Sequence, residues 1–309
     1  MLTCDTYHIP TSLPEALEML NRYAENEVRI LAGATDTFPW ARQGRVGDVT
    51  GDHHVENIVD VSRVPELNGY EVKAGRVRMG SSLVFQDFLE DETLSSHLPN
   101  MRYCAIWFAD DQIRRQATLA GNLANASPVA DGTPAMVALN AEVELASLVG
   151  KEIIKRQIPI TDFITGPGRT MLAENELITA VTCDSVHGYG GSFEKVGQRR
   201  SLVISVACAT CCVKVSGDGR RVEDIRLALG GIGPAPIRLD DAEDLLRGSD
   251  ITYAAISSAA KLAPNRVASR SRRDYREEVI QGFAERAIID ALADCGVNIK
   301  EKIEGLTHV

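Results

Sequence analysis

The alternation of apolar and polar positions divides the chain into two regions. In the first region the pattern predicts helices at 12–23, 82–89, 101–110 and 135–139, and strands at 28–31, 58–61, 70–73, 76–80 and 142–147. From Ser192 onward it predicts longer strands at 201–215 and 222–229, and helices at 239–246, 253–262 and 275–295. Gly75, Gly217 and Gly219 supply the turns of two hairpins. We therefore expect an α+β protein with an antiparallel sheet in its second region.

The change of pattern also predicts the domain organisation. A first domain is expected over 1–181, in two parts of about 1–57 and 58–181, and a second over 190–309. A chain of 309 residues is long enough for such domains to share a sizeable core. Its 44% hydrophobic and 25% charged residues are average, and no apolar run approaches the roughly 20 residues of a membrane span. The first residues show no export signal, so we expect a cytoplasmic protein.

Charge and cysteine content exclude further classes of protein. A net charge of −10 argues against nucleic acid or an anionic membrane as the main partner. The seven cysteines are scattered and odd in number, unlike a disulfide framework. Cys208, Cys211 and Cys212 invite an iron–sulfur interpretation, but they lie in a run that alternates like a half-buried strand. In a strand Cys211 points away from the other two, so the three thiols cannot converge on one metal.

Two runs of small residues carry the candidate binding chemistry. The first consists of Leu31, Ala32, Gly33, Ala34, Thr35 and Asp36. The second consists of Thr118, Leu119, Ala120, Gly121 and Asn122, and is followed by Asn125, Ser127 and Asp131. Small residues let backbone N–H groups approach a diphosphate closely. The first run lacks the G-x-G-x-x-G spacing of a Rossmann fold. One such run alone favours an ordinary turn, whereas two runs with several amide and hydroxyl donors indicate a dinucleotide site.

Together with the segment Phe193 to Arg200, these runs resemble the FAD-binding subunit of the xanthine dehydrogenase and carbon monoxide dehydrogenase family of molybdenum hydroxylases. The resemblance covers nearly the whole chain, and the spacings from Phe108 to Thr118 and from Asn122 to Asp131 also match. It implies a two-part FAD-binding domain of the PCMH/VAO-like type, followed by a C-terminal α+β domain of the CO dehydrogenase flavoprotein type. The implied cofactor of this chain is FAD.

The resemblance implies that both runs grip the FAD pyrophosphate. Leu31 to Asp36 would hold it through backbone N–H groups and the Thr35 hydroxyl, and Thr118 to Asn122 would wrap the opposite side. The family usually has a double glycine in each run, whereas this chain has Ala34 and Ala120. We expect both alanines in ordinary backbone regions, where alanine merely stiffens the loop. A positive φ at either would add strain of about 1–2 kcal/mol.

The resemblance also assigns the remaining candidates. Phe108 would pack in the flavin pocket, and Leu177 and Ile178 would line the adenine pocket. Asp131 would accept a hydrogen bond from the adenosine portion. Lys195 would approach the isoalloxazine, where a cation can stabilise the negative charge of the reduced flavin. No catalytic residue and no metal ligand is implied for this chain.

The function implied by the resemblance is electron relay. A large partner would oxidise the substrate at a molybdenum cofactor, and a small partner would pass single electrons through two [2Fe–2S] clusters. This chain would collect them on FAD and deliver them to NAD⁺, a quinone or O₂. The expected assembly is a dimer of heterotrimers, a heterohexamer. Two alternatives stay open: a self-sufficient FAD oxidoreductase of the same fold, reduced directly by its own substrate, and a flavin-free scaffold subunit.

Two further groups of residues can be interpreted either as functional sites or as ordinary surface structure. His53 and His54, between acidic residues, are expected to form an exposed polar loop rather than a metal site. A basic run could dock the acidic face of an iron–sulfur partner, although a solvated helix entrance explains it equally well. That run consists of Arg266, Arg270, Arg272, Arg273 and Arg276.

Overall fold

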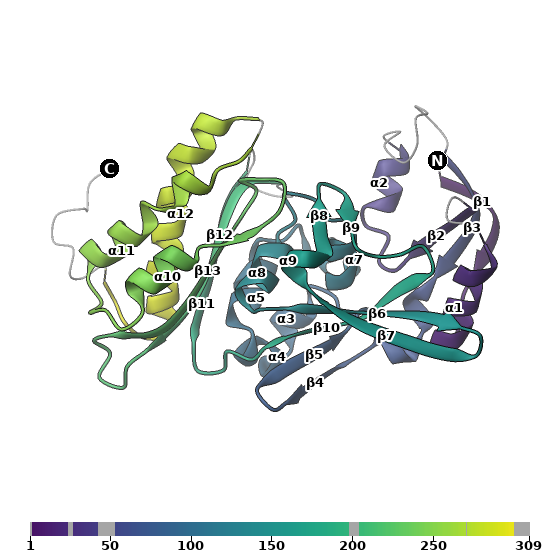
Figure 1. The fold of residues 1–309 in the computed structure, drawn as a ribbon, viewed down its shortest axis with the longest axis horizontal. Helices are drawn as coiled ribbons and strands as arrows, with labels where there is room; N and C mark the ends of the chain where they lie inside the picture. The colour runs from purple at the N-terminus through teal and green to yellow at the C-terminus, as the bar shows by residue number, and fades with distance from the viewer. Residues whose placement is uncertain (1, 24–26, 43–52, 198–203, 270, 300–309) are drawn as a thin grey trace.

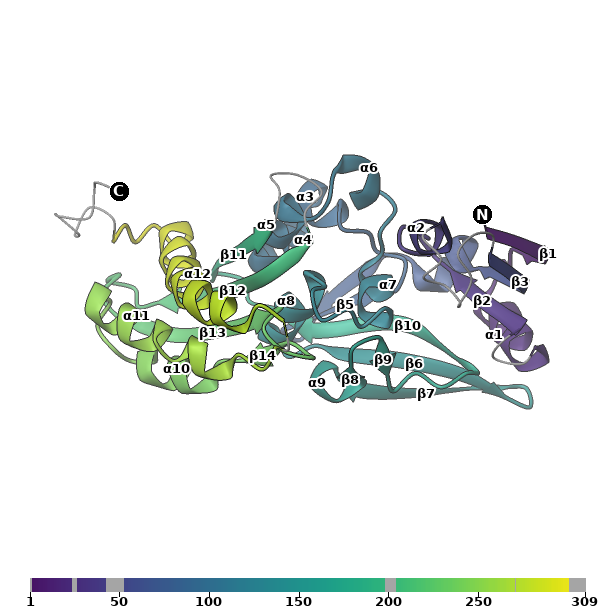
Figure 2. The same cartoon turned by 90° about the horizontal axis from the view of Figure 1, so that it is seen from above.

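Three sheets follow one another along the longest axis of the molecule (Figures 1 and 2). The structure is a computed structural model, and it describes residues 2–23, 27–42, 53–197, 204–269 and 271–299. The sheet at the N-terminal end is parallel, in the order β1-β3-β2, with β1 at Leu2–His8, β2 at Val28–Leu31 and β3 at His53–Asp60. Helix α1 (Leu13–Arg22) starts at its cap Ser12, whose hydroxyl accepts a hydrogen bond from the N–H of Glu15. Its buried leucines form one core cluster with Val59 and Leu177, which joins this sheet to the middle one.

The middle sheet is antiparallel, in the order β4-β5-β10-β6-β7. Its strands are β4 (Tyr70–Lys73), β5 (Arg76–Gly80), β6 (Glu142–Val149), β7 (Glu152–Pro159) and β10 (Glu176–Asp184). Helix α2 (Thr37–Arg42) lies between β2 and β3 of the N-terminal sheet. The segments between the strands of the middle sheet form α3 (Asp87–Glu90), α4 (Glu92–His97), α5 (Pro99–Trp107), α6 (Asp111–Arg114), α7 (Leu119–Ala124), α8 (Gly132–Ala138), α9 (Ile160–Phe163), and a small hairpin of β8 (Ile164–Gly166) and β9 (Arg169–Thr170). Phe85, Phe88 and Phe163 are fully buried in the core of this region.

The third sheet is antiparallel and lies between the middle region and three helices (Figure 1). It contains β11 (Gly190–Gly197), β12 (Ser205–Val215), β13 (Val222–Gly230) and β14 (Ile237–Arg238). The helices are α10 (Asp240–Leu246), α11 (Tyr253–Ala260) and α12 (Arg273–Asp294). The predicted helices and the hairpin of the second region are thus confirmed, with helix ends displaced by one to two residues in places. The strand expected from 201 begins at Ser205, and positions 201–203 lie outside the described residues.

Strand β12 buries its cysteines on opposite faces, as predicted. Cys208 and Cys212 belong to the core of the middle region, whereas Cys211 belongs to the core under the C-terminal helices. Burial raises the pKa of the Cys208 thiol well above its usual range and that of Cys212 to about 12. Both side chains therefore pack as neutral thiols. Among the described residues, no group of three metal-ligating side chains comes together.

Several elements differ from the sequence-based predictions. The helix expected at 82–89 is confined to Asp87–Glu90, because Val84 pairs with Thr118 in a short bridge. The run Thr118 to Asn122, expected as a loop, forms the first turn of α7. Strands β1, β7, β10 and β11 were not predicted, and β10 extends beyond the predicted domain boundary at 181. No helix in the described part of the chain is long and apolar enough to cross a membrane.

One prediction about surface features was wrong, and a second holds only in part. His53 and His54 lie in β3 rather than in a loop, because β3 pairs there with β1. The ring of His54 contacts the hydroxyl of Thr3 and the carboxylate of Asp5. The basic run is not one solvated face: Arg276 is 8% exposed, and Arg266 and Arg273 are paired with carboxylates of their own domain. Arg270 lies outside the described residues.

Candidate functional site

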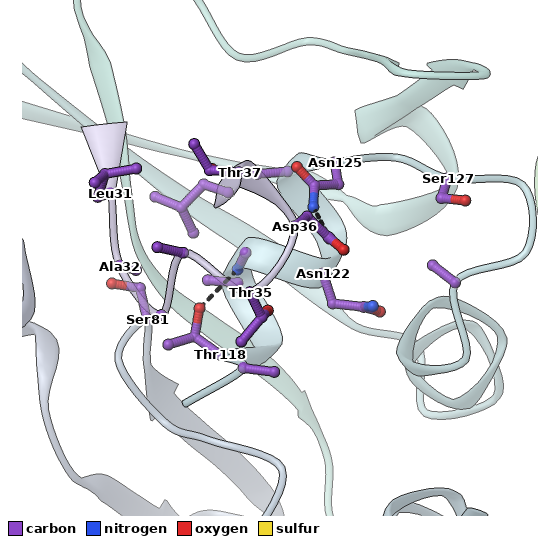
Figure 3. Close-up of a pocket in the computed structure, with 18 of the residues that line it drawn as sticks. Leu31, Ala32, Thr35, Asp36, Thr37, Ser81, Thr118, Asn122, Asn125 and Ser127 are labelled. Atoms are coloured by element: carbon purple, nitrogen blue, oxygen red, sulfur yellow. Dashed lines mark hydrogen bonds between the residues drawn. The ribbon is translucent and has the colours of Figure 1, made fainter. Parts of the chain in front are cut away.

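A cleft of about 770 Å³ opens where the N-terminal sheet, the middle region and the start of β12 meet (Figure 3). The loop after β2 forms one wall, and α7 with the segment after it forms the opposite wall. Every site residue predicted from the sequence lines this cleft except Leu119 and Lys195. Leu119 is 2% exposed and belongs to the hydrophobic core. Lys195 reaches the cleft wall through its contact with Asp131.

The loop after β2 presents bare backbone donors. Leu31 anchors it in the core, and the chain then turns through residues 32 to 36 before α2 begins. Within the described part of the chain, no protein group accepts a hydrogen bond from the N–H of residues 33 to 36. Ala34 has φ of 55°, in the left-handed region. A left-handed residue in such a run turns successive N–H groups toward one side, which creates a concave site for an anion.

The two walls of the cleft touch each other at Gly33. A Cβ built on this residue would lie 1.7 Å from the carbonyl oxygen of Gln116, just ahead of α7. Only glycine permits this approach of one backbone to another. The side-chain amide of Asn125 also donates a hydrogen bond to the carboxylate of Asp36 (Figure 3). The first loop is therefore held directly against the second wall, although the two are far apart in the sequence.

The second wall is organised by the cap of α7. The hydroxyl of Thr118 accepts a hydrogen bond of 3.0 Å from the N–H of Gly121 (Figure 3). The side-chain carbonyl of Asn122 accepts another of 3.1 Å from the N–H of Gly132, at the start of α8. These contacts leave the small side chains of the helix facing the cleft. A bulky group in the cleft can thus approach the backbone closely on this side as well.

The far end of the cleft contains a buried ion pair. The ammonium of Lys195, with its side chain 1% exposed, lies 2.7 Å from the carboxylate of Asp131, which is 8% exposed. The hydroxyl of Ser205 donates to the other oxygen of the same carboxylate. Burial raises the pKa of Asp131, opposed by Lys195 and by the hydrogen bond from Ser205. The sequence assigned Asp131 and Lys195 to different ends of FAD, but the structure brings them together.

Apolar residues complete the cleft. Phe108 stacks on Phe85 with ring centroids 3.8 Å apart and an angle of 2° between the ring planes. Leu177 and Ile178, both in β10, add aliphatic side chains to the lining of the cleft. Sequence reasoning missed Ser81, Ile204 and Ser205, which also line the cleft. No local signal marks them, since each reaches the cleft only through long-range packing.

The left-handed conformation of Ala34 contradicts the expected ordinary backbone, whereas Ala120 does lie in a helix. We therefore expect Ala34→Gly and Ala120→Gly to have opposite effects. Glycine at 34 relieves left-handed strain and should raise the free energy of unfolding by about 1 kcal/mol. Glycine at 120 should lower it by about 1 kcal/mol through lost helix propensity. Urea unfolding of both variants measures the difference, and changes of the same sign would contradict it.

The cleft fits a dinucleotide such as FAD. The N–H groups of residues 33 to 36, which have no acceptor among the described residues, carry the partial positive charge that a diphosphate needs. The hydroxyl of Ser82, a cleft residue, is buried and has no partner within the described structure. Aromatic and aliphatic side chains suit the flat rings at the ends of such a cofactor. The cleft thus offers hydrogen-bond donors for phosphate groups and apolar side chains for ring systems.

Comparisons with known proteins agree with this assignment. Residues 3–183 match the FAD binding domain in molybdopterin dehydrogenase, and residues 192–291 match the CO dehydrogenase flavoprotein C-terminal domain. The xanthine dehydrogenase FAD-binding subunit of Escherichia coli O157:H7 is 29% identical over 303 residues, covering 94% of this chain and 97% of that protein. The carbon monoxide dehydrogenase medium chain of Hydrogenophaga pseudoflava is 26% identical, with the same coverage.

Solved structures of similar proteins share the fold. A chain of the Cu,Mo-CO dehydrogenase superposes with a TM-score of 0.84 at 25% identity, covering 95% of this chain and 99% of that one. A chain of quinoline 2-oxidoreductase from Pseudomonas putida 86 gives 0.82 at 25% identity, covering 94% and 97%. These matches confirm the predicted fold class and the predicted cofactor, FAD. The chain belongs to the family of FAD-binding domains in molybdopterin dehydrogenases, as a flavoprotein component of xanthine and CO dehydrogenase-type oxidoreductases.

Proposed function

We propose that this chain is the electron-transfer subunit of a multisubunit molybdenum hydroxylase. It would take electrons from the [2Fe–2S] clusters of a small partner. These electrons would come from a substrate oxidised at a molybdenum cofactor in a large partner. One observation carries this proposal: in the cleft, the N–H groups of residues 33 to 36 donate no hydrogen bond to any described residue. The chain that contains this cleft aligns along its length with the medium chain of such an enzyme. FAD, when bound, accepts electrons singly and releases them as a pair, to NAD⁺, a quinone or O₂.

Each wall of the cleft has a part in this function. The N–H groups of residues 33 to 36 would bind the pyrophosphate, and the start of α7 would close over it from the other side. The apolar surface of Leu177 and Ile178 would receive the adenine. Phe108, Asp131 and Lys195 would surround the flavin end, where the ammonium can offset negative charge on the reduced ring. No residue of this chain needs to act as an acid or base.

The proposed partners follow from the relatives. Their names include medium chain and medium subunit, which describe assemblies with one larger and one smaller chain. We expect a dimer of heterotrimers in the cytoplasm. In this arrangement the large partner determines the substrate specificity of the whole enzyme, and this chain determines which electron acceptor is reduced.

The proposal is tested by purification with and without partners. The isolated chain should turn yellow on incubation with FAD and bind one equivalent, measured by absorbance after gel filtration. Its flavin should be reduced by the substrate of the holoenzyme only when the large and small chains are present. A protein that remains colourless would instead be a scaffold. A flavin reduced by an organic substrate without any partner would indicate a self-sufficient oxidoreductase.

A further inference from the structure

Arg276 is a buried cation held by backbone carbonyl oxygens. It lies in the first turns of α12 and is 8% exposed. Its guanidinium donates to the carbonyl oxygens of Val206, Gly231 and Ser271. Among the described residues it makes no ion pair, and its charged neighbour Arg272 is of like sign. Burying a guanidinium against neutral carbonyls is costly, so the arrangement calls for a reason beyond filling space.

The carbonyl of Val206 belongs to a β-bulge. In the pairing of β11 with β12, Val196 lies opposite Ala207 and Gly197 lies opposite Ser205, so Val206 is the extra residue. A bulge leaves one residue outside the ladder and re-aims the neighbouring side chains. Arg276 binds the carbonyl of this extra residue. The shape of the bulge therefore depends on a side chain from α12.

The bulge adjoins the flavin end of the cleft. The hydroxyl of Ser205, immediately before Val206, donates a hydrogen bond of 2.5 Å to Asp131, and Lys195 pairs with the same carboxylate from β11. The second carbonyl held by Arg276 is that of Gly231, whose N–H donates a hydrogen bond of 3.1 Å to the carbonyl of Pro128. Pro128 directly follows Ser127, a cleft residue. Arg276 thus holds two segments through which the C-terminal domain touches this end of the cleft.

We propose that Arg276 is a positioning residue for the flavin. By holding the bulge at Val206, it orients Ser205 toward Asp131 and so sets the Asp131–Lys195 pair that the cofactor meets. This inference rests on the proposed binding of FAD in the cleft. A lysine at 276 keeps the charge, but a single ammonium on a flexible stem does not reproduce the planar set of donors.

The test compares Arg276→Lys and Ser205→Ala with the wild type and with Arg273→Lys, an exposed control on the same helix that is paired to Glu277. Each full-length protein is reconstituted with FAD, and the dissociation constant, the visible flavin spectrum and the midpoint potential are measured. We expect Arg276→Lys and Ser205→Ala each to weaken FAD binding about tenfold, the size of one charge-assisted hydrogen bond. Both should shift the flavin spectrum and potential in the same direction, and Arg273→Lys should change neither.

A double variant separates positioning from a general loss of stability. If Arg276 acts through Ser205, the double variant binds FAD no more weakly than the weaker single variant. Losses that multiply, or an unchanged spectrum in Arg276→Lys, would overturn the inference. Should Arg276→Lys be insoluble, Ser205→Ala decides alone, since an unchanged flavin spectrum there removes the route from Arg276 to the cofactor. A wild-type chain that takes up no FAD would instead overturn the proposed function.

Discussion

Replacing Gly33 by alanine is expected to weaken FAD binding by about a hundredfold or more. The added Cβ would lie 1.7 Å from the carbonyl oxygen of Gln116 and 2.5 Å from its carbonyl carbon. Both atoms are backbone, so no side chain can turn aside to make room. The loop must move away from the second wall, and the N–H groups of residues 33 to 36 lose their position. A displacement of about 1 Å at a pre-organised binding site is enough for a loss of this size.

The control for this prediction is Gly217→Ala. Gly217 lies in an exposed turn, has no positive φ and has no heavy atom within 4 Å of the point where the alanine methyl group would stand. The same chemical change there should leave FAD binding and stability unaltered. Titration of each apoprotein with FAD, followed by quenching of flavin fluorescence, gives the two dissociation constants. Equal constants for Gly33→Ala and wild type would show that the two walls do not need their close contact.

The sequence reveals the first loop because its signal is local. A strand followed by small residues can be recognised in Leu31 to Asp36 without any knowledge of the rest of the fold. The backbone conformation of Ala34 cannot be recognised in this way, since alanine rarely adopts a left-handed φ and no neighbouring residue indicates one. The residue before it, Gly33, lies directly against Gln116, which is far along the chain, so the surroundings of this turn depend on long-range packing.

The second run of small residues, Thr118 to Asn122, was predicted with the wrong secondary structure. Its small residues indicate a loop, but Thr118 caps α7 and the run is helical. Gly121 stands where a capping box would have glutamate or glutamine, and glycine also lowers helix propensity. The helix forms nevertheless, because the side chains of Leu119 and Leu123 are buried in the core. Tertiary packing therefore outweighs the local preference, which a single sequence does not display.

The far end of the cleft is the hardest part to predict. Asp131 and Lys195 are each identified from the sequence, but their contact depends on how β11 is placed against the segment before α8. Ser205 and Arg276 are still more distant in the sequence, and they join the same site through the bulge in β12. Local patterns identify candidate residues, whereas the arrangement of three sheets decides which candidates meet.

Removing the charge of Lys195 is expected to destabilise the fold strongly. Lys195→Met leaves the carboxylate of Asp131 buried with the hydroxyl of Ser205 but without its cation. Breaking one partner of a buried ion pair costs about 3–5 kcal/mol. The double variant Lys195→Met with Asp131→Asn removes the uncompensated charge and should recover most of this loss. Urea unfolding of the two variants and the wild type measures both effects, and an equally unstable double variant would contradict the assignment.

The same variant should show a distinct dependence on pH. Burial already raises the pKa of Asp131 in the wild type, and loss of the neighbouring ammonium raises that pKa further. A folded-state pKa above the unfolded value of about 4 means that the folded protein binds the proton more tightly. The free energy of unfolding of Lys195→Met therefore decreases as the pH rises toward the folded pKa, and its deficit relative to wild type shrinks on acidification. Unfolding curves at about pH 5 and pH 8 test this sign. The double variant, in which residue 131 no longer titrates, should lack this contribution to the pH dependence of its free energy of unfolding.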